Sequence, residues 1–481
     1  MAYKHGVYVS EVATSLIPPV NTSAGLPVVF GTAPVHLAAE PADANKPVLC
    51  YTYAEAVAAF GYSDDWNSYT LCEAMTAAFS LYNRAPIVFV NVLNPAKHKK
   101  SVKSEELPMA DKTSVINKPV IINSLKVKKA SGGEALVAGK DYEAGYNDNG
   151  GVTITALVGG GIEVINNIFV DYDMLDPSAI KATDIVGGVD VSTGAESGLE
   201  VLEQVFTETG LVPGMVLAPG WSDTPEVAAV MRAKASNING SFSAITLNDI
   251  PTQTVTKYTD VAKWKNNNNY TDPLQIACWP LVRLSETVYH MSTHVMGVLM
   301  VLDSTNDDIP YESPSNKTMQ INGLCLADGT EVRLNKEQAN YLNGQGVVTA
   351  LNFLGGWKCW GNRTACYPAN TDPKDAFICV RRMFIWHAQT FILTYWQKVD
   401  KPITKRLIQT IIDSENVRIN GLVGQGALLG GRIEFLSDEN PTTNLIDGKI
   451  KFHTYLTPPV PARVIDNVIE YDPSYFSTLF A

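Results

Sequence analysis

The alternation of short apolar runs with helical patterns in the middle of the chain constrains its fold most strongly. Beyond Gly194, three apolar runs of strand length are separated by helix-forming segments: residues 215–218, 242–247 and 274–279. Thr224-Pro225 is a typical helix start, because threonine caps the first turn and proline has no backbone N–H to leave unpaired. Strands that alternate with helices predict a mostly parallel sheet covered by helices.

A second α/β unit is predicted near the N-terminus. Thr52 and Glu55 have the spacing of a capping box ahead of an alanine-rich helix. Apolar residues at helical spacing mark one face of a following helix: Leu71, Met75, Ala78 and Tyr82. Residues 87–93 are then predicted to form a buried strand. With 481 residues the chain is too long for one ordinary core. We expect residues 21–95 and 188–366 to build one α/β core together.

Residues 96–187 differ in composition from the segments on either side. They begin with a basic stretch, which is typical of a solvated linker, and continue as short β-like runs without helical periodicity. Turn signals such as Asp148-Asn149-Gly150-Gly151 separate these runs. We expect an inserted β domain here, either a small β-barrel or a β-sandwich.

Residues 367–460 carry both helix and strand signals. After Asp372-Pro373, apolar side chains recur at spacings of three and four, which predicts one long amphipathic helix: Phe377, Val380, Phe384, His387, Phe391 and Tyr395. A second helix rich in isoleucine follows near Ile411, and residues 449–456 alternate between apolar and polar side chains as a strand does. The interpretation is an α+β C-terminal domain.

Both ends of the chain are predicted to be extended arms, residues 1–20 and 461–481. Prolines, which cannot donate to a strand ladder, separate each arm from its neighbour in the sequence. Open strand edges invite pairing with another chain. The residues expected to form intersubunit strands are Val7, Tyr8, Val9, Glu11, Val12, Val464, Ile465, Val468, Ile469 and Tyr471.

Composition argues against several classes of partner. A net charge of −12 disfavours nonspecific nucleic-acid binding, which needs clustered lysine and arginine. The N-terminal residues contain no apolar segment of a signal peptide, and no apolar run is long enough to span a bilayer. Seven cysteines without a C-x-x-C pair are interpreted as reduced thiols. We expect synthesis in the cytoplasm, no direct nucleic-acid contact and no membrane insertion.

The sequence offers little that supports catalysis. His290 and His294 have the spacing of two zinc ligands on a helix, but Met291 stands where a zinc hydrolase needs its glutamate. The chain has no G-x-S-x-G elbow and no P-loop lysine motif. We expect no enzyme activity, no metal and no cofactor. A metal-dependent hydrolase around the two histidines remains the alternative.

Three clusters between residues 313 and 431 and one near the N-terminus point to a structural role. They are Ser313-Pro314-Ser315-Asn316-Lys317, Trp360-Gly361-Asn362-Arg363-Thr364, Gly424-Gln425-Gly426-Ala427-Leu428-Leu429-Gly430-Gly431 and Gly6-Val7-Tyr8-Val9-Ser10-Glu11. In their order along the chain, with the Gly6 cluster first, they resemble the motifs of contractile tail sheath proteins, found in myophage tails, R-type bacteriocins and related injection systems. The similarity extends over nearly the whole chain and is weakest in the inserted β region.

The resemblance implies a subunit of stacked rings around an inner tube, which shorten and widen on firing and drive the tube through a bacterial envelope. It implies arms that add strands to neighbouring subunits, and a loop at Trp360, Gly361, Asn362, Arg363 and Thr364 that holds the core or its link to the last domain. The implied partners are further copies of the chain, the inner tail tube protein, and baseplate and tail terminator proteins. Assembly would take place in the bacterial cytoplasm, and the product would be a virion tail or a released contractile particle. A non-contractile surface or shell polymer is a further alternative.

Overall fold

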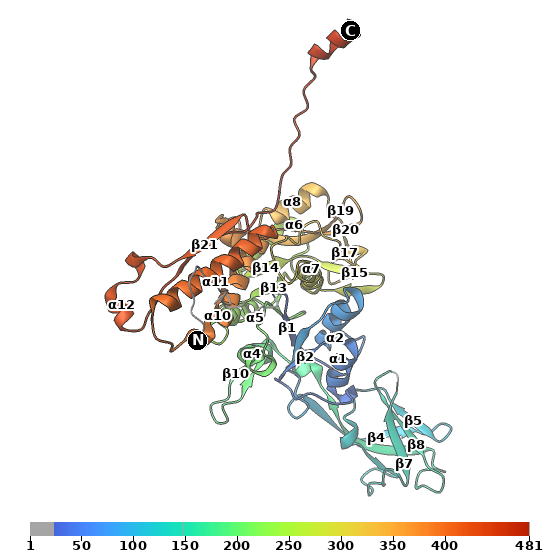
Figure 1. The fold of residues 1–481 in the computed structure, drawn as a ribbon. Helices are drawn as coiled ribbons and strands as arrows, with labels where there is room; N and C mark the ends of the chain where they lie inside the picture. Colours follow the sequence, from blue (N-terminus) through green and yellow to red (C-terminus); the bar gives the residue numbers. More distant parts are fainter. Residues whose placement is uncertain (1–23, 148, 481) are drawn as a thin grey trace, which may run out of the picture.

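A computed structural model of the chain describes residues 24–147 and 149–480. A central α/β body carries a β-rich lobe at one end and a pair of long helices at its side, while the C-terminal segment projects away from the body (Figure 1). The fold is a mixed α/β architecture with several separate sheets. The strand expected near Val7 lies outside the described residues.

The central sheet has eight strands, and its middle is parallel, which confirms the prediction from the alternating pattern. Only the two edge strands, β2 and β20, run antiparallel to their neighbours. In spatial order the strands are β2 (Pro47–Cys50), β3 (Ile87–Asn91), β1 (Pro27–Gly31), β12 (Met215–Leu217), β13 (Ile245–Asp249), β14 (Gln275–Cys278), β19 (Val347–Asn352) and β20 (Trp357–Trp360).

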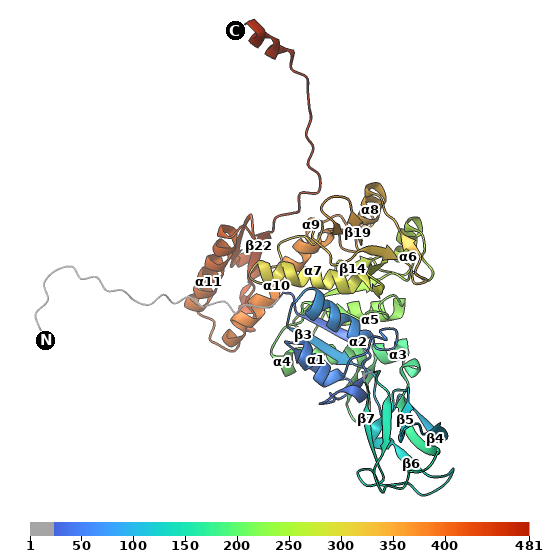
Figure 2. The ribbon, with the colours of Figure 1, turned by 90° about the vertical axis from the view of Figure 1, so that its right-hand side faces the viewer.

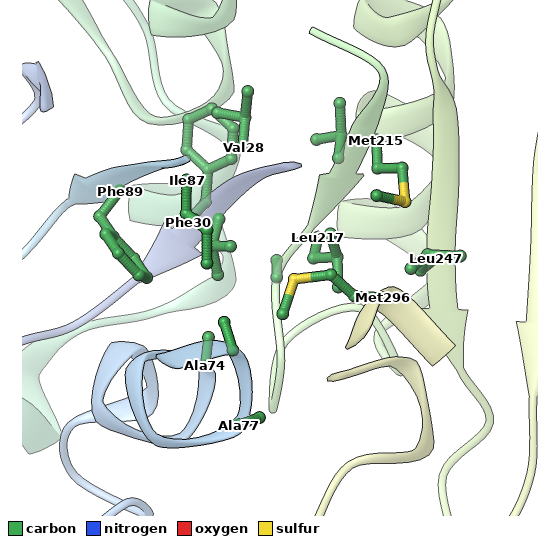
Figure 3. Close-up of a cluster of buried hydrophobic side chains, with 14 of the residues drawn as sticks. Val28, Phe30, Ala74, Ala77, Ile87, Phe89, Met215, Leu217, Leu247 and Met296 are labelled. Atoms are coloured by element: carbon green, nitrogen blue, oxygen red, sulfur yellow. The ribbon is translucent and has the colours of Figure 1, made fainter. Parts of the chain in front are cut away.

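Every residue of β1, β3, β12, β13 and β14 is buried, as expected for parallel strands covered on both faces. Phe89 and Leu217 share one face of the sheet and belong to the same buried cluster as Ala74 from one covering helix and Met296 from another (Figure 3). This contiguous apolar core supplies most of the hydrophobic stabilisation of the body.

The helices that cover the sheet begin where the sequence signals place them. Thr52 Oγ1 accepts a hydrogen bond from Glu55 N at 3.2 Å, and Asn335 and Gln338 form a reciprocal capping box. The helices are α1 (Tyr53–Phe60), α2 (Thr70–Met75) with a π-helical continuation (Thr76–Leu81), α3 (Ala182–Val186), α4 (Gln204–Thr209), α5 (Pro225–Ala235), α6 (Tyr258–Asn267), α7 (Met291–Thr305) and α8 (Lys336–Asn343). Two small sheets complete this part: β10 (Gly188–Val189) with β11 (Glu196–Ser197), and β16 (Thr287–Tyr289), β15 (Leu281–Leu284), β17 (Gly323–Cys325) and β18 (Glu331–Val332).

The inserted region is β-rich, but its strands do not close into a barrel. They form two three-stranded antiparallel sheets: β4 (Lys99–Pro108), β9 (Asn167–Leu175) and β6 (Lys126–Lys128), and β5 (Thr113–Ile116), β8 (Val152–Ala156) and β7 (Tyr142–Tyr146). Val127 and Val170 from the first sheet share a buried core with Ile154 from the second. The barrel that we expected as one of two forms is therefore wrong for the described residues, because short strands such as β6 leave the edges of the two sheets unpaired.

The C-terminal part is α+β, with two corrections to the predicted elements. Its elements are α9 (Pro373–Ala376), α10 (Ile378–Tyr395), α11 (Lys405–Gly424), β21 (Gly430–Glu434), α12 (Thr442–Ile446) and β22 (His453–Thr457). The single long helix from Pro373 is interrupted at Phe377, whose backbone is extended because it pairs with Arg363. The last strand begins at His453 instead of residue 449, because the side chain of Asn440 binds both backbone polar groups of Lys451.

The C-terminal segment 461–472 contains no regular element and runs outward from the body in both views (Figures 1 and 2). It ends in a 3-10 helix, Pro473–Phe480, whose side chains are exposed. Across the described residues, no helix is both long and apolar enough to cross a membrane.

Candidate functional site

A polar pocket lies where the C-terminal segment leaves the body. Its volume is about 320 Å³, and four parts of the chain that are distant in sequence supply its wall. The lining residues are Ser313, Ser315, Asn316, Asn340, Asn343, Gly344, Trp360, Asn362, Arg363, Tyr367, Pro461, Ala462, Arg463 and Val464. Two of the clusters singled out in the sequence and the root of the expected C-terminal arm thus meet at one place.

The loop after β20 is fixed to its neighbours by directional hydrogen bonds. Trp360 Nε1 donates to Asn340 Oδ1 at 2.9 Å, and Asn362 N donates to Asn343 Oδ1 at 3.0 Å, so the last turns of α8 hold the loop. Ser315 Oγ accepts a hydrogen bond from Gly361 N at 3.2 Å. Ser315 and Asn343 supply acceptors for two backbone N–H groups of the loop, and the Trp360 indole adds a side-chain hydrogen bond to α8.

Gly361 is required by a close approach of two strands. A Cβ atom at this position would lie 2.8 Å from Val348 Cα and 2.9 Å from Val348 Cγ2. Contacts this short do not occur between real carbon atoms, so any side chain would push β20 away from β19. The glycine allows the loop to turn tightly against the central sheet.

Arg363 is held by aromatic rings. Its guanidinium carbon lies 4.3 Å from the ring centre of Tyr367 and 3.7 Å from that of Phe377, which is close stacking geometry for a cation on an aromatic face. Burial lowers the pKa of Arg363, and the nearby charge of Arg463 lowers it further. Within residues 24–147 and 149–480, no carboxylate forms an ion pair with either arginine.

The same loop fastens the central body to the C-terminal helices. Thr364 Oγ1 donates to Asp375 O at 2.6 Å, and Thr364 N donates to Ala376 O at 3.1 Å. Ile378 N donates to Asn362 O at 3.1 Å. The loop therefore sits against the break between α9 and α10, and this geometry favours the interpretation of residues 360–364 as a structural anchor.

The residues expected to form the C-terminal arm strand are exposed and have no strand partner in the described chain. Ile465, Val468 and Ile469 are 86% to 90% exposed and Tyr471 is 74% exposed. Four apolar side chains in water on one short segment are unfavourable unless another surface covers them. Pairing of this segment with a neighbour stays a prediction, and the N-terminal arm residues lie outside the described part of the chain.

The structure also reveals an open sheet edge that the sequence did not indicate. In the two-stranded sheet, the backbone N–H and C=O of Ile433 bind the side chain of Asn416, so they point away from β22. Because Ile433 lies opposite Thr454, the antiparallel pattern turns the backbone groups of Thr454 and Leu456 away from β21. Among the described residues these groups have no backbone partner, so β22 presents an edge that can accept one more strand.

A buried ion pair joins the C-terminal helices to the start of the described chain. Arg382 on α10 donates to Asp303 at the end of α7, with Nη1 to Oδ1 at 2.9 Å, and Arg382 Nη2 also donates to Ala24 O at 3.0 Å. Both side chains are nearly inaccessible to water. The hydrogen bond from Arg382 fixes the backbone at Ala24, the first residue that the structure describes. Sequence reasoning missed it because the partners are 79 positions apart.

The two histidines considered as zinc ligands have separate partners. His290 Nδ1 lies 2.7 Å from Glu73 Oε2, whereas His294 Nδ1 lies 2.9 Å from the hydroxyl of Tyr82. Burial opposes the charge on His290, but Glu73 and then Asp249 raise the pKa of His290 to about 9. Burial lowers the pKa of His294 to about 4. The part of the chain that the structure describes contains no group of three or more side chains placed to hold a metal ion.

Burial raises the pKa of Asp249 to about 6, although the His290 charge acts in the opposite direction. The Asp249 carboxylate accepts from Ser292 N at 3.0 Å at the start of α7. This cluster joins α2, β13 and α7 inside the body. Its hydrogen-bond partners are those of a structural contact between helices and sheet.

The fold and this site define a class of protein: a multidomain α/β body with a pocket at the root of an exposed C-terminal segment, and an open edge on a two-stranded sheet. Comparisons with known proteins identify chains that are similar in sequence or in fold. No model of a known protein family matches the chain. It is 26% identical to the tail sheath protein of Burkholderia phage BcepMu over 99% of this chain and 98% of that protein. It is 23% identical to the tail sheath protein of Escherichia phage P2 over 73% of this chain and 84% of that protein.

Solved structures agree with these relatives at the level of the fold. The sheath complex of an extracellular contractile injection system, PVC, in the contracted state has a TM-score of 0.57 at 13% identity, and covers 99% of each chain. The helical sheath of the anti-feeding prophage in the contracted state has a TM-score of 0.56 at 15% identity, and covers 97% of this chain and 99% of that chain. The resemblance to contractile tail sheath proteins is therefore confirmed.

Proposed function

We propose that the protein is the structural subunit of a contractile tail sheath, which polymerises around an inner tube and contracts to drive that tube through a bacterial envelope. The observation that carries the proposal is the combination, in one chain, of an open strand edge on β22 and an exposed apolar segment at residues 464–471. The β22 edge lacks a partner strand, and the apolar segment lacks a surface that covers it. The edge of one copy and the segment of a second copy can supply these to each other. The full-length similarity to tail sheath proteins supports this function.

The arm is long enough to cover the edge, and its chemistry suits the edge. β22 has five residues, about 17 Å of strand, and the arm segment of residues 464–471 is longer, about 27 Å. An arm laid beside β22 pairs the free backbone groups of Thr454 and Leu456, and buries apolar side chains such as Ile465 and Ile469. A two-stranded sheet is marginal by itself, so a third strand also stabilises the C-terminal part.

The inserted lobe lies apart from the surfaces proposed to join copies. The two three-stranded sheets around one core make a sandwich-like unit attached only to one end of the body, which leaves it free of the arm and the β22 edge (Figure 2).

The inner tube, baseplate and terminator proteins are the proposed partners. Assembly takes place in the bacterial cytoplasm, and contraction releases a trapped lattice, without a nucleotide or another cofactor.

Removal of the N-terminal arm tests the proposal. Full-length protein and a variant lacking residues 1–20 are concentrated in parallel, and assembly is followed by sedimentation. We expect the full-length chain to sediment as large particles and the shortened chain to remain in the supernatant, because the arm links neighbouring copies. Equal sedimentation of both proteins would refute the role of that arm. Thermal unfolding of the shortened chain checks that its body is folded.

A further inference from the structure

We propose that the pocket at the root of the C-terminal arm binds a carboxylate from the arm of a second copy of this chain, either Asp466 or Glu470. The inference rests on the proposed function and adds a charge-specific contact to the strand pairing. It concerns a site that strand pairing alone does not need.

The pocket has the chemistry of an anion site. Arg363 and Arg463 both line it, and neither forms an ion pair within the described residues. Arg363 makes no hydrogen bond through its guanidinium to those residues either, because Tyr367 and Phe377 hold it by its faces and leave its N–H groups free. A planar guanidinium with free donors is well suited to a carboxylate, which accepts two parallel hydrogen bonds.

The two arginines also disfavour each other in the isolated chain. Like charges held near one another in a partly enclosed site are unfavourable until a counter-charge enters. The Arg363 guanidinium cannot move out of the pocket, because it stacks on Phe377 and its backbone pairs with that of Phe377. Arg463 lies on the exposed arm root, so an incoming carboxylate relieves the repulsion and fixes the direction in which the arm departs.

The pocket contains a second unsatisfied polar group. Asn362 is 5% exposed, and its Oδ1 atom has no hydrogen-bond partner in the described part of the chain. A buried amide oxygen without a donor costs free energy. Water that accompanies a bound carboxylate, or a backbone N–H of the incoming segment, can satisfy it.

The choice of occupant follows from position. Three residues separate the end of β22 at Thr457 from Pro461 in the pocket wall, so the four residue steps span at most about 14 Å. An arm strand laid along β22 is longer than β22, so its end reaches beyond that strand toward the pocket. Asp466 and Glu470 occupy the strand face opposite Ile465 and Ile469, and both are exposed without an ion pair in the described chain.

The overall charge makes such a contact useful. Each copy carries a net charge of −12, so copies repel one another as they approach. A cationic pocket at the point where arms exchange provides a local attraction of the opposite sign. It selects one register of the arm, because a shift by one residue would turn Asp466 and Glu470 to the other face.

Charge reversal at Arg463 tests the inference in the full-length protein. The concentration needed for assembly is measured by sedimentation for Arg463→Glu and for the matched control Arg406→Glu, an exposed arginine on α11 outside the pocket. We expect Arg463→Glu to raise that concentration about tenfold or more, the loss expected for a charge-assisted pair. Arg406→Glu assembles like the wild type, and the thermal unfolding midpoints of both variants stay unchanged.

Rescue identifies the carboxylate. We expect Arg463→Glu combined with Asp466→Lys or with Glu470→Lys to restore assembly, because the swapped pair attracts again. Normal assembly of Arg463→Glu would overturn the site. A defect that neither second substitution rescues would overturn the assignment to the arm. If the wild type itself fails to assemble, the proposed function fails first, and the inference fails with it.

Discussion

The central body and the C-terminal periphery satisfy their polar and apolar groups in opposite ways. In the body, parallel strands are buried on both faces, and the buried charges of Glu73, Asp303 and Arg382 and the partly buried His290 all have partners within the chain. At the periphery, β22 has unpaired backbone groups, the arm exposes apolar side chains, and Arg363 and Arg463 lack a counter-charge in the described residues. The first region satisfies these groups within the chain, and we propose that other copies complete the second.

Removal of the C-terminal arm should have the largest effect, and this effect should fall on assembly and spare the stability of the body. A variant that ends at residue 461 lacks every exposed apolar side chain of the arm but retains β22. We expect complete loss of assembly and an almost unchanged thermal unfolding midpoint, because residues 465–480 are exposed and only the arm root at residues 462–464 lines the pocket. Sedimentation and calorimetry measure the two effects. A large fall in the midpoint would show that the arm belongs to the folded body.

Breaking the buried ion pair should act on the body instead. Asp303→Asn leaves the buried Arg382 charge without its counter-ion, and we expect a loss of about 3–5 kcal/mol in the free energy of unfolding, measured with urea. The exposed pair between Arg333 and Glu331 provides the control, since Arg333→Gln should leave the free energy of unfolding nearly unchanged. Similar losses in the two variants would contradict the contrast between buried and exposed charges.

The body should also lose stability at alkaline pH through His290. Its pKa of about 9 in the folded state lies above the usual 6.5, so the stabilisation is complete below pH 6.5 and is lost as pH rises through 9. We expect the wild type to lose about 2–3 kcal/mol more than His290→Gln between pH 7 and pH 9.5. Subtraction of the variant removes the opposite contribution of Lys265, whose pKa burial lowers to about 8. Identical pH profiles would contradict the His290–Glu73 pair.

A proline on the open edge should produce the smallest change. Thr454→Pro removes a backbone N–H that faces away from β21, so the hydrogen bond that is lost is one to the incoming arm strand. We expect assembly to need about tenfold more protein, which corresponds to about 1.4 kcal/mol. Tyr455→Pro, at the neighbouring position paired with Arg432, should instead destabilise the folded chain. Equal stability losses for the two prolines would show that the edge is assigned incorrectly.

Sequence reasoning predicted the elements whose causes are local. Apolar runs predicted the parallel strands. The capping residues Thr52 and Asn335 predicted helix starts, because the residues that they bind lie three positions further along the chain. Contacts between distant segments interrupted other elements: pairing with Arg363 ended the first part of the helix at Phe377, and Asn440 displaced the start of β22. The two clusters around Asn316 and Asn362 were recognised separately, but their meeting with Arg463 in one pocket depends on the tertiary fold.

Cryo-electron microscopy of assembled full-length protein tests the central claim most directly. We predict hollow, striated tubes in which residues 464–471 of one copy, or the N-terminal arm of one copy, form a strand beside Thr454 and Leu456 of another. Tubes in which the β22 edge faces solvent would contradict the account of assembly. Protein that remains monomeric at every concentration, alone and with an inner tube protein, would contradict the sheath function.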